Sequence, residues 1–230
     1  MTEFFTAIGI FLLAHIIPPT PAVRQFLIRV VGRRVYIVAY SLLSLVLIVW
    51  VIISALRAPY VALWPAEAWQ VFVPLIVMPF AIWFVIGGLA ESNPLSISLY
   101  SNTCNGLGPM AHITRHPVLW GFLLWALSHI PPNGNLVAVV LFTGMALLAS
   151  GGFWLADRRA RRRIGDKKWK ELTRSTSIIP FAALARSRSS ISGVSHLFLW
   201  GTIAIAVYIW FLLQGHALLI GLDPLASLNL

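Results

Sequence analysis

The chain has 230 residues, of which 59% are hydrophobic and only 10% are charged. Soluble domains carry about 25% charged residues, so this composition excludes a soluble globular enzyme and predicts an all-α, polytopic integral membrane protein surrounded by lipid. The formal net charge of +10 would suit a nucleic-acid partner. The basic residues lie between apolar segments, however, where membrane topology places them, so we expect no nucleic acid to bind. The single cysteine, Cys104, excludes a disulfide framework within the chain.

Six apolar segments follow one another and predict a helical bundle of about six transmembrane helices. They are Phe4–Ile17, Val35–Leu56, Val71–Ala90, Thr114–Ile130, Leu136–Ala156 and Val194–Leu213. Several reach the roughly 20 residues that span a bilayer. The first and the fourth are shorter, and each ends at a pair of prolines. We expect one membrane domain over residues 1–222.

The lysines and arginines predict the orientation of these segments. Sixteen of the 17 fall in alternate loops, and Arg57 is the exception. Such residues concentrate on the cytoplasmic side, so both termini are expected outside, which is the periplasm for a bacterial inner membrane. The most basic stretch, residues 157–190, is then a cytoplasmic segment. It serves either as a topological anchor alone or as a surface for anionic lipid headgroups.

A basic corner, Thr114-Arg115-His116-Pro117, opens the fourth segment. Pro117 suits the first turn of a helix, which Thr114 or His116 would cap. Arg115 would lie beside exposed helix N–H groups, where a haem propionate, a lipid phosphate or a cofactor carboxylate could bind. The alternative is that Arg115 is an interfacial anchor. The polar loop before the corner, Glu91–Ile113, is either a cap over a site or an ordinary connector.

Two of the six histidines lie inside apolar segments. At about 1.5 Å per helical residue, His15 lies roughly 16 Å from the outer face and His129 roughly 18 Å from the inner face. Both therefore fall near the middle of a hydrocarbon core about 30 Å thick. Two imidazoles at one depth suit axial ligation of a haem iron, or the beginning of another metal site. Alternatively, each histidine bonds a backbone carbonyl or a serine of a neighbouring helix.

Three stretches, taken in order, resemble the NnrU family of bacterial membrane proteins over nearly the whole chain. They read AHIIPPTPAVRQFLIRVVGRRVYIVAYSLLS, ITRHPVLWGFLLWALSHIPPNGN and DKKWKELTRSTSIIPFAAL. The resemblance implies an inner-membrane protein associated with denitrification, in the production of active nitrite and nitric oxide reductases.

The same family includes the zeta-carotene isomerase of plants and cyanobacteria, a membrane haem protein. That resemblance implies haem b held by His15 and His129. We expect Arg115, near the cytoplasmic rim of this site, and His116 to bind the cofactor as well. It also implies, as an alternative function, haem-dependent isomerisation of a lipid-soluble substrate. The isomerase pattern carries a cysteine where this chain has Ala126. An exchange of iron ligands that uses the thiol of this cysteine is therefore not possible in this chain.

A second resemblance points to a different class of enzyme. Arg115-His116-Pro117, followed by Gly165, Trp169 and the pair Ile179-Pro180, is similar to the isoprenylcysteine and phospholipid methyltransferases. This implies S-adenosylmethionine as a cofactor at the cytoplasmic face. Those enzymes carry acidic residues before the basic segment, whereas here Asp157 is followed by arginines.

Overall fold

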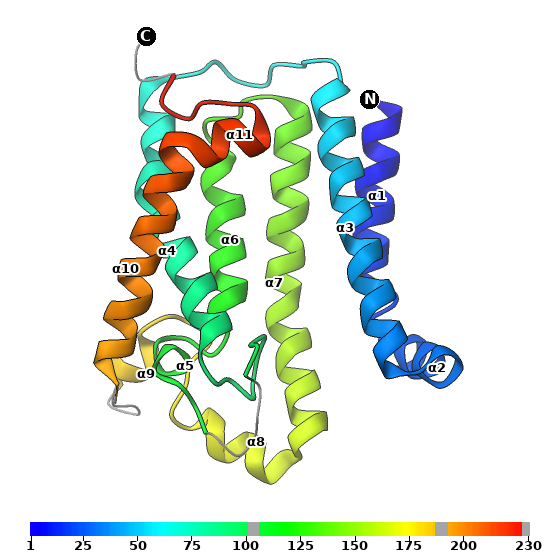
Figure 1. The fold of residues 1–230 in the computed structure, drawn as a ribbon, viewed down its shortest axis with the longest axis vertical. Coiled ribbons are helices and arrows are strands. Elements are labelled where there is room, and N and C mark those ends of the chain that lie inside the picture. Colours follow the sequence, from blue (N-terminus) through cyan, green and yellow to red (C-terminus); the bar gives the residue numbers. More distant parts are fainter. Residues whose placement is uncertain (101–105, 187–192, 227–230) are drawn as a thin grey trace. The chain divides into compact units, whose positions relative to one another are not determined.

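The computed structural model describes residues 1–100, 106–186 and 193–226, and Cys104 lies outside them. The described residues are mainly helical (Figure 1) and contain one isolated antiparallel bridge, between Ala62 and Asn135. The all-α prediction is confirmed. The helices are α1 (Thr2–Ile16), α2 (Pro21–Val31), α3 (Arg33–Arg57), α4 (Ala68–Ala90), α5 (Pro109–Ile113), α6 (Pro117–His129), α7 (Leu136–Ile164), α8 (Asp166–Thr173), α9 (Ala182–Ala185), α10 (Val194–Trp210), the π-helix η2 (Phe211–Gly215) and α11 (His216–Ile220).

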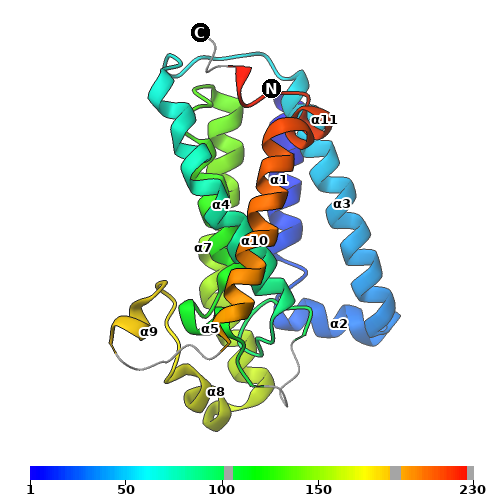
Figure 2. The same ribbon diagram turned by 60° about the vertical axis from the view of Figure 1, so that its left-hand side comes forward.

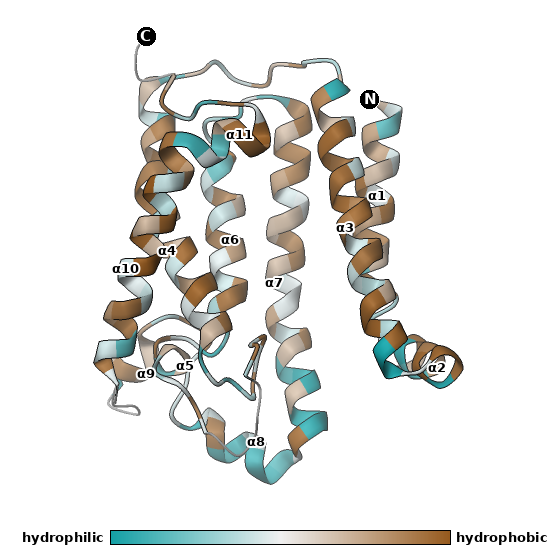
Figure 3. Cartoon of the chain, viewed as in Figure 1, coloured by the Kyte–Doolittle hydropathy of each residue, from teal (hydrophilic) through white to brown (hydrophobic). Residues whose placement is uncertain are grey.

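All six predicted apolar segments are helices. Four helical stretches are long and apolar enough to cross a membrane, namely α3, α4, α7 and the continuous run from α10 to α11, whereas α1 and α6 are shorter. These helices consist largely of hydrophobic residues (Figure 3), and many of their large apolar side chains are exposed, so the protein is embedded in a membrane. Helix α7 continues beyond the predicted end at Ala156 as far as Ile164. The extension consists mostly of arginine and alanine, which favour helix as strongly as apolar residues do.

Contacts gather the chain into two compact units, and each is described by itself. The first comprises Met1–Pro65 and Asn133–Gly144. In it α1 packs against α3, and α2 lies across one end of this helical pair (Figure 1). The prediction of a single domain over residues 1–222 stays a prediction.

The second unit comprises Ala66–Pro132 and Met145–Leu230, and its centre is α4, which packs against both α6 and α10 (Figure 2). Small residues allow the close approach of α4 and α6. A methyl group added at Gly121 would lie 2.6 Å from the carbonyl oxygen of Ala81, and one at Gly88 would lie 2.7 Å from the Pro117 ring. Without water to drive association, such close packing is what holds membrane helices together.

Helix α4 contains two internal prolines, and α10 compensates for one of them. Pro79 has no N–H, so the carbonyl of Leu75 one turn earlier loses its helical partner. The Tyr208 hydroxyl on α10 donates a hydrogen bond of 2.9 Å to that carbonyl. A polar group in lipid must find such a partner within the protein, so this bond links two membrane helices.

Removing this hydroxyl tests the compensation. We expect Tyr208→Phe to lower the free energy of unfolding by about 1–2 kcal/mol, because it leaves a carbonyl unsatisfied. In a Pro79→Ala background the helix supplies its own N–H, and the effect should shrink below about 0.5 kcal/mol. SDS titration of detergent-solubilised protein, followed by circular dichroism, measures both. Tyr60→Phe, at an exposed tyrosine, is the control; equal losses in the two backgrounds would contradict the argument.

Candidate functional site

The basic corner between α5 and α6 is built around a carboxylate from α7. The Arg115 guanidinium Nη1 lies 2.6 Å from one oxygen of Asp157, and His116 Nε2 lies 3.1 Å from the other. His116 is fully buried, and the side chains of Arg115 and Asp157 are only 11% and 17% exposed. The anionic partner expected for Arg115 is therefore found within the chain itself. Breaking such a pair leaves a charge in a poorly hydrated place, which is strongly destabilising.

The loop from Glu91 to Ile113 contacts this corner. Ser96 Oγ lies 2.9 Å from His116 Nδ1, and the Asn93 amide donates a hydrogen bond of 2.9 Å to the Arg115 carbonyl. Since a carboxylate only accepts, a neutral His116 donates from Nε2 to Asp157 and accepts from Ser96 at Nδ1. The imidazole is thus fixed at both nitrogens and in one tautomer.

A strap, defined as residues 175–181, fastens the other side of the corner. The Arg115 N–H donates to the Ser177 carbonyl, and the Thr114 hydroxyl and the Trp120 indole both donate to the Ile178 carbonyl, each at 2.7 Å. His116 is the N-cap residue of α6, but neither its side chain nor that of Thr114 caps the helix by a hydrogen bond. The His116 imidazole contacts Ser96 and Asp157 instead, and the Thr114 hydroxyl donates to the strap. The capping prediction was wrong.

Two further contacts link the corner to the basic segment. The Arg115 Nε donates a hydrogen bond of 3.0 Å to the Thr176 hydroxyl on the strap. The guanidinium groups of Arg115 and Arg161 lie 5.8 Å and 5.5 Å, respectively, from the centre of the Trp169 ring on α8. Cation–π attraction of this kind stabilises a cation that has lost part of its water. Of the residues that carry the second resemblance, Arg115 and Trp169 therefore meet in space.

A second buried carboxylate, Glu91, joins α4 to α5 and α10. It accepts hydrogen bonds from the Met110 N–H and from the Trp200 indole, the latter at 3.1 Å. Burial raises the pKa of Glu91, and these two donors together with the nearby His196 partly offset the increase. Two buried acids thus hold the same end of the unit together.

His15 and His129, the two histidines predicted to lie inside the membrane, share a local geometry. His15 is the penultimate residue of α1, and its Nδ1 lies 2.8 Å from the Phe11 carbonyl oxygen. His129 is the last residue of α6, and its Nδ1 lies 2.7 Å from the Trp125 carbonyl oxygen. A carbonyl only accepts, so each Nδ1 carries the proton and each Nε2 keeps its lone pair. This is the tautomer that a metal-binding histidine needs, with its orientation set by a backbone carbonyl.

His15 lies in the first unit and His129 in the second, so their pairing stays a prediction. Within the described residues, no cluster of three or more histidine, cysteine or acidic side chains could hold a metal ion. Axial ligation of a haem iron needs only two imidazoles, so the haem prediction does not require such a cluster.

Asp157 is the functional residue that the sequence analysis missed. It was treated as the start of a basic loop, although α7 carries it on to the corner. An acid placed at the last apolar turn, directly before a run of arginines, was the available signal.

The fold and the site define a polytopic α-helical membrane protein whose helix ends are joined by buried ion pairs. A family model, described as NnrU protein, matches residues 3–224, and the chain belongs to this family. It is 32% identical over 177 residues to the chloroplastic 15-cis-zeta-carotene isomerase of Zea mays, a match that covers 71% of this chain and 45% of the relative. It is 38% identical over 76 residues to the same enzyme of Arabidopsis thaliana, over 33% of this chain and 20% of the relative. The chain thus spans less than half the length of these curated relatives, and no solved structure matches it.

Neutralising Asp157 tests how much the corner depends on it. Buried pairs cost about 3–5 kcal/mol to break, and since Asp157 keeps some exposure we expect Asp157→Asn to lower the unfolding free energy by about 2–3 kcal/mol. Asp166→Asn is the matched control, because it breaks an exposed pair with Arg161 and should have no measurable effect. SDS titration measures both variants, and equal stabilities would show that the corner does not need the charge.

Proposed function

We propose that this protein binds haem b through His15 and His129 and isomerises a double bond in a lipid-soluble polyene. The observation that carries this proposal is the relation to a 15-cis-zeta-carotene isomerase over 71% of the chain. The shared Nδ1-to-carbonyl geometry of the two histidines supports the ligand assignment. When bound, the haem would supply an iron centre that accepts and donates electrons within the membrane.

The chain's own residues have separate tasks in this proposal. His15 and His129 would hold the iron, and the carbonyls of Phe11 and Trp125 would orient their rings. Ala126, buried beside Trp125 on α6, can supply no ligand, so exchange of an imidazole for a thiol at this position is not part of the proposal. Arg115 and His116, which the sequence analysis predicts to bind the cofactor, instead hold the corner through Asp157 in this proposal.

A role in denitrification, in support of nitrite and nitric oxide reduction, is the second candidate. The NnrU family membership is the observation that favours it. We place the protein in a bacterial inner membrane because of its membership of the NnrU family. The distribution of basic residues supports both termini on the periplasmic side. The matched relatives are chloroplastic isomerases, so the methyltransferase alternative is not proposed.

The visible spectrum of detergent-purified protein tests the cofactor. Two imidazole ligands should give a low-spin haem with a sharp α band on reduction. We expect His15→Ala and His129→Ala each to lose this band. His216→Ala is the matched control, since His216 also has its Nδ1 on a carbonyl, that of Leu222 at 2.7 Å. Retention of the full spectrum in both ligand variants would refute the assignment.

Conversion of 15-cis-zeta-carotene, followed by chromatography of the extracted pigments, tests the reaction. Reconstituted protein loaded with haem should convert the substrate, and His129→Ala should reduce the rate at least tenfold. His216→Ala should leave the rate unchanged. An intact haem spectrum without any conversion would contradict the isomerase proposal and leave denitrification as the better candidate.

A further inference from the structure

The second unit has a strongly charged surface that the proposed function does not use. The basic end, defined as residues 157–174, comprises the last turns of α7 together with α8. It holds nine lysines and arginines against three acidic residues, a surplus of six positive charges. Figure 3 shows it as a hydrophilic region below the apolar part of α7.

The three acidic residues of this segment cannot balance the six surplus positive charges, because each acidic residue already has a partner. Asp157 is held by Arg115 and His116, which lie outside the basic end. Asp166 pairs with Arg161, and Glu171 pairs with Lys168. Arg162, Lys167, Lys170 and Arg174 are exposed, and their positive charge remains to attract an external anion.

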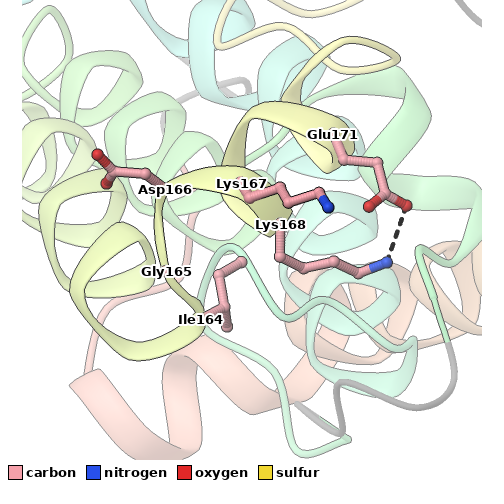
Figure 4. A pocket seen from close by; sticks show the side chains of 6 residues that line it. All are labelled: Ile164, Gly165, Asp166, Lys167, Lys168 and Glu171. Carbon is pink, nitrogen blue, oxygen red and sulfur yellow. Dashed lines mark hydrogen bonds and ion pairs between the residues drawn. The ribbon is translucent and has the colours of Figure 1, made fainter.

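A hollow at the turn between α7 and α8 gives such an anion a place. It has a volume of about 420 Å³ and is lined by Ile164, Gly165, Asp166, Lys167, Lys168 and Glu171. In Figure 4 the Lys167 ammonium lies on the same side as the Lys168–Glu171 ion pair, whereas the Asp166 carboxylate points away from it, so Lys167 is the cation of the hollow that an external anion would meet. The size and the polar lining of the hollow favour a negatively charged group with several polar atoms, such as a phospholipid headgroup.

Exposed apolar side chains beside the basic end indicate that the anion belongs to a membrane. Trp154 is 65% exposed, and the Arg158 guanidinium one turn later lies 5.0 Å from its ring centre. Tryptophan prefers the level of the lipid headgroups, and arginine extends from there toward phosphate. On the strap, Ile179 and Phe181 are 63% and 51% exposed.

The backbone at Phe181 supports the same conclusion. Its φ angle of 62° places Phe181 in the left-handed region, which is unfavourable for a bulky side chain. Its N–H is fixed by the Ile113 carbonyl at 2.8 Å. The fold therefore holds an exposed phenyl ring outward against a local strain, and such strain concentrates at functional surfaces.

We propose that the basic end binds the headgroups of anionic phospholipids, with Trp154 and the strap in the adjoining bilayer. The charge surplus supplies attraction to the leaflet, the hollow admits one headgroup, and the apolar side chains set the depth. A polyanion such as nucleic acid would complement the positive charge but would not bury the exposed apolar side chains.

Native mass spectrometry of the full-length protein, with added phosphatidylglycerol or phosphatidylcholine, tests this proposal. We expect phosphatidylglycerol adducts to be at least threefold more abundant than phosphatidylcholine adducts. A variant with Arg162, Lys167, Lys170 and Arg174 all changed to glutamine should lose most of this preference. The matched control changes Arg24, Arg29, Arg33 and Arg34 of the first unit to glutamine, which removes the same charge and should retain the preference.

Three outcomes would overturn the proposal. They are equal binding of the two lipids by the unaltered protein, an undiminished preference in the first quadruple variant, and equal losses in the two quadruple variants, which would show an effect of overall charge alone. Circular dichroism confirms that each variant is folded. If the first variant does not fold, the unaltered protein in 0.5 M salt replaces it, and the preference should then fall by more than half because the attraction is screened.

Discussion

The arrangement of the larger unit depends on one carboxylate in a poorly hydrated place. Asp157 joins α7 to the corner before α6, because it accepts from both Arg115 and His116. Three otherwise separate elements then meet at that corner: the loop through Ser96, the strap through Thr176, and α8 through Trp169. Membrane helices lack a strong hydrophobic force for association, so a cluster of satisfied polar groups at their ends can determine how they pack. Because Asp157 pairs with residues outside the basic end, it does not neutralise the arginines and lysines of that segment.

The histidines proposed as haem ligands belong to another part of the structure. His129 is one helix length away from the corner along α6, at the opposite end of that helix. The polar, hydrogen-bonded end organises the fold of this unit, and the histidine proposed as a haem ligand lies at the other end of α6. This division explains why the conspicuous Arg115-His116 pair is assigned to architecture and the less conspicuous His129 to chemistry. The similarity to a 15-cis-zeta-carotene isomerase is the basis for the reaction proposed at His129.

Much of this structure could be predicted from the sequence. Long apolar runs must form helices in lipid, so all six segments and the family were identified correctly. Contacts between distant segments could not be predicted, because composition and hydropathy contain no information about partners. Asp157, 41 residues after His116, is one such partner; the Tyr208 hydroxyl that compensates for Pro79 is another. The end of α7 was misplaced because hydropathy falls at the arginines, whereas helix propensity does not.

A double-mutant cycle between Arg115 and Asp157 tests the central claim most directly. The cycle compares Arg115→Met, Asp157→Leu and the double variant by SDS titration in detergent. If the buried pair organises the corner, each single change strands a charge and the double change does not, so the coupling free energy should be about 2 kcal/mol or more. A coupling below about 0.5 kcal/mol would mean that the two residues act independently, and it would contradict the account.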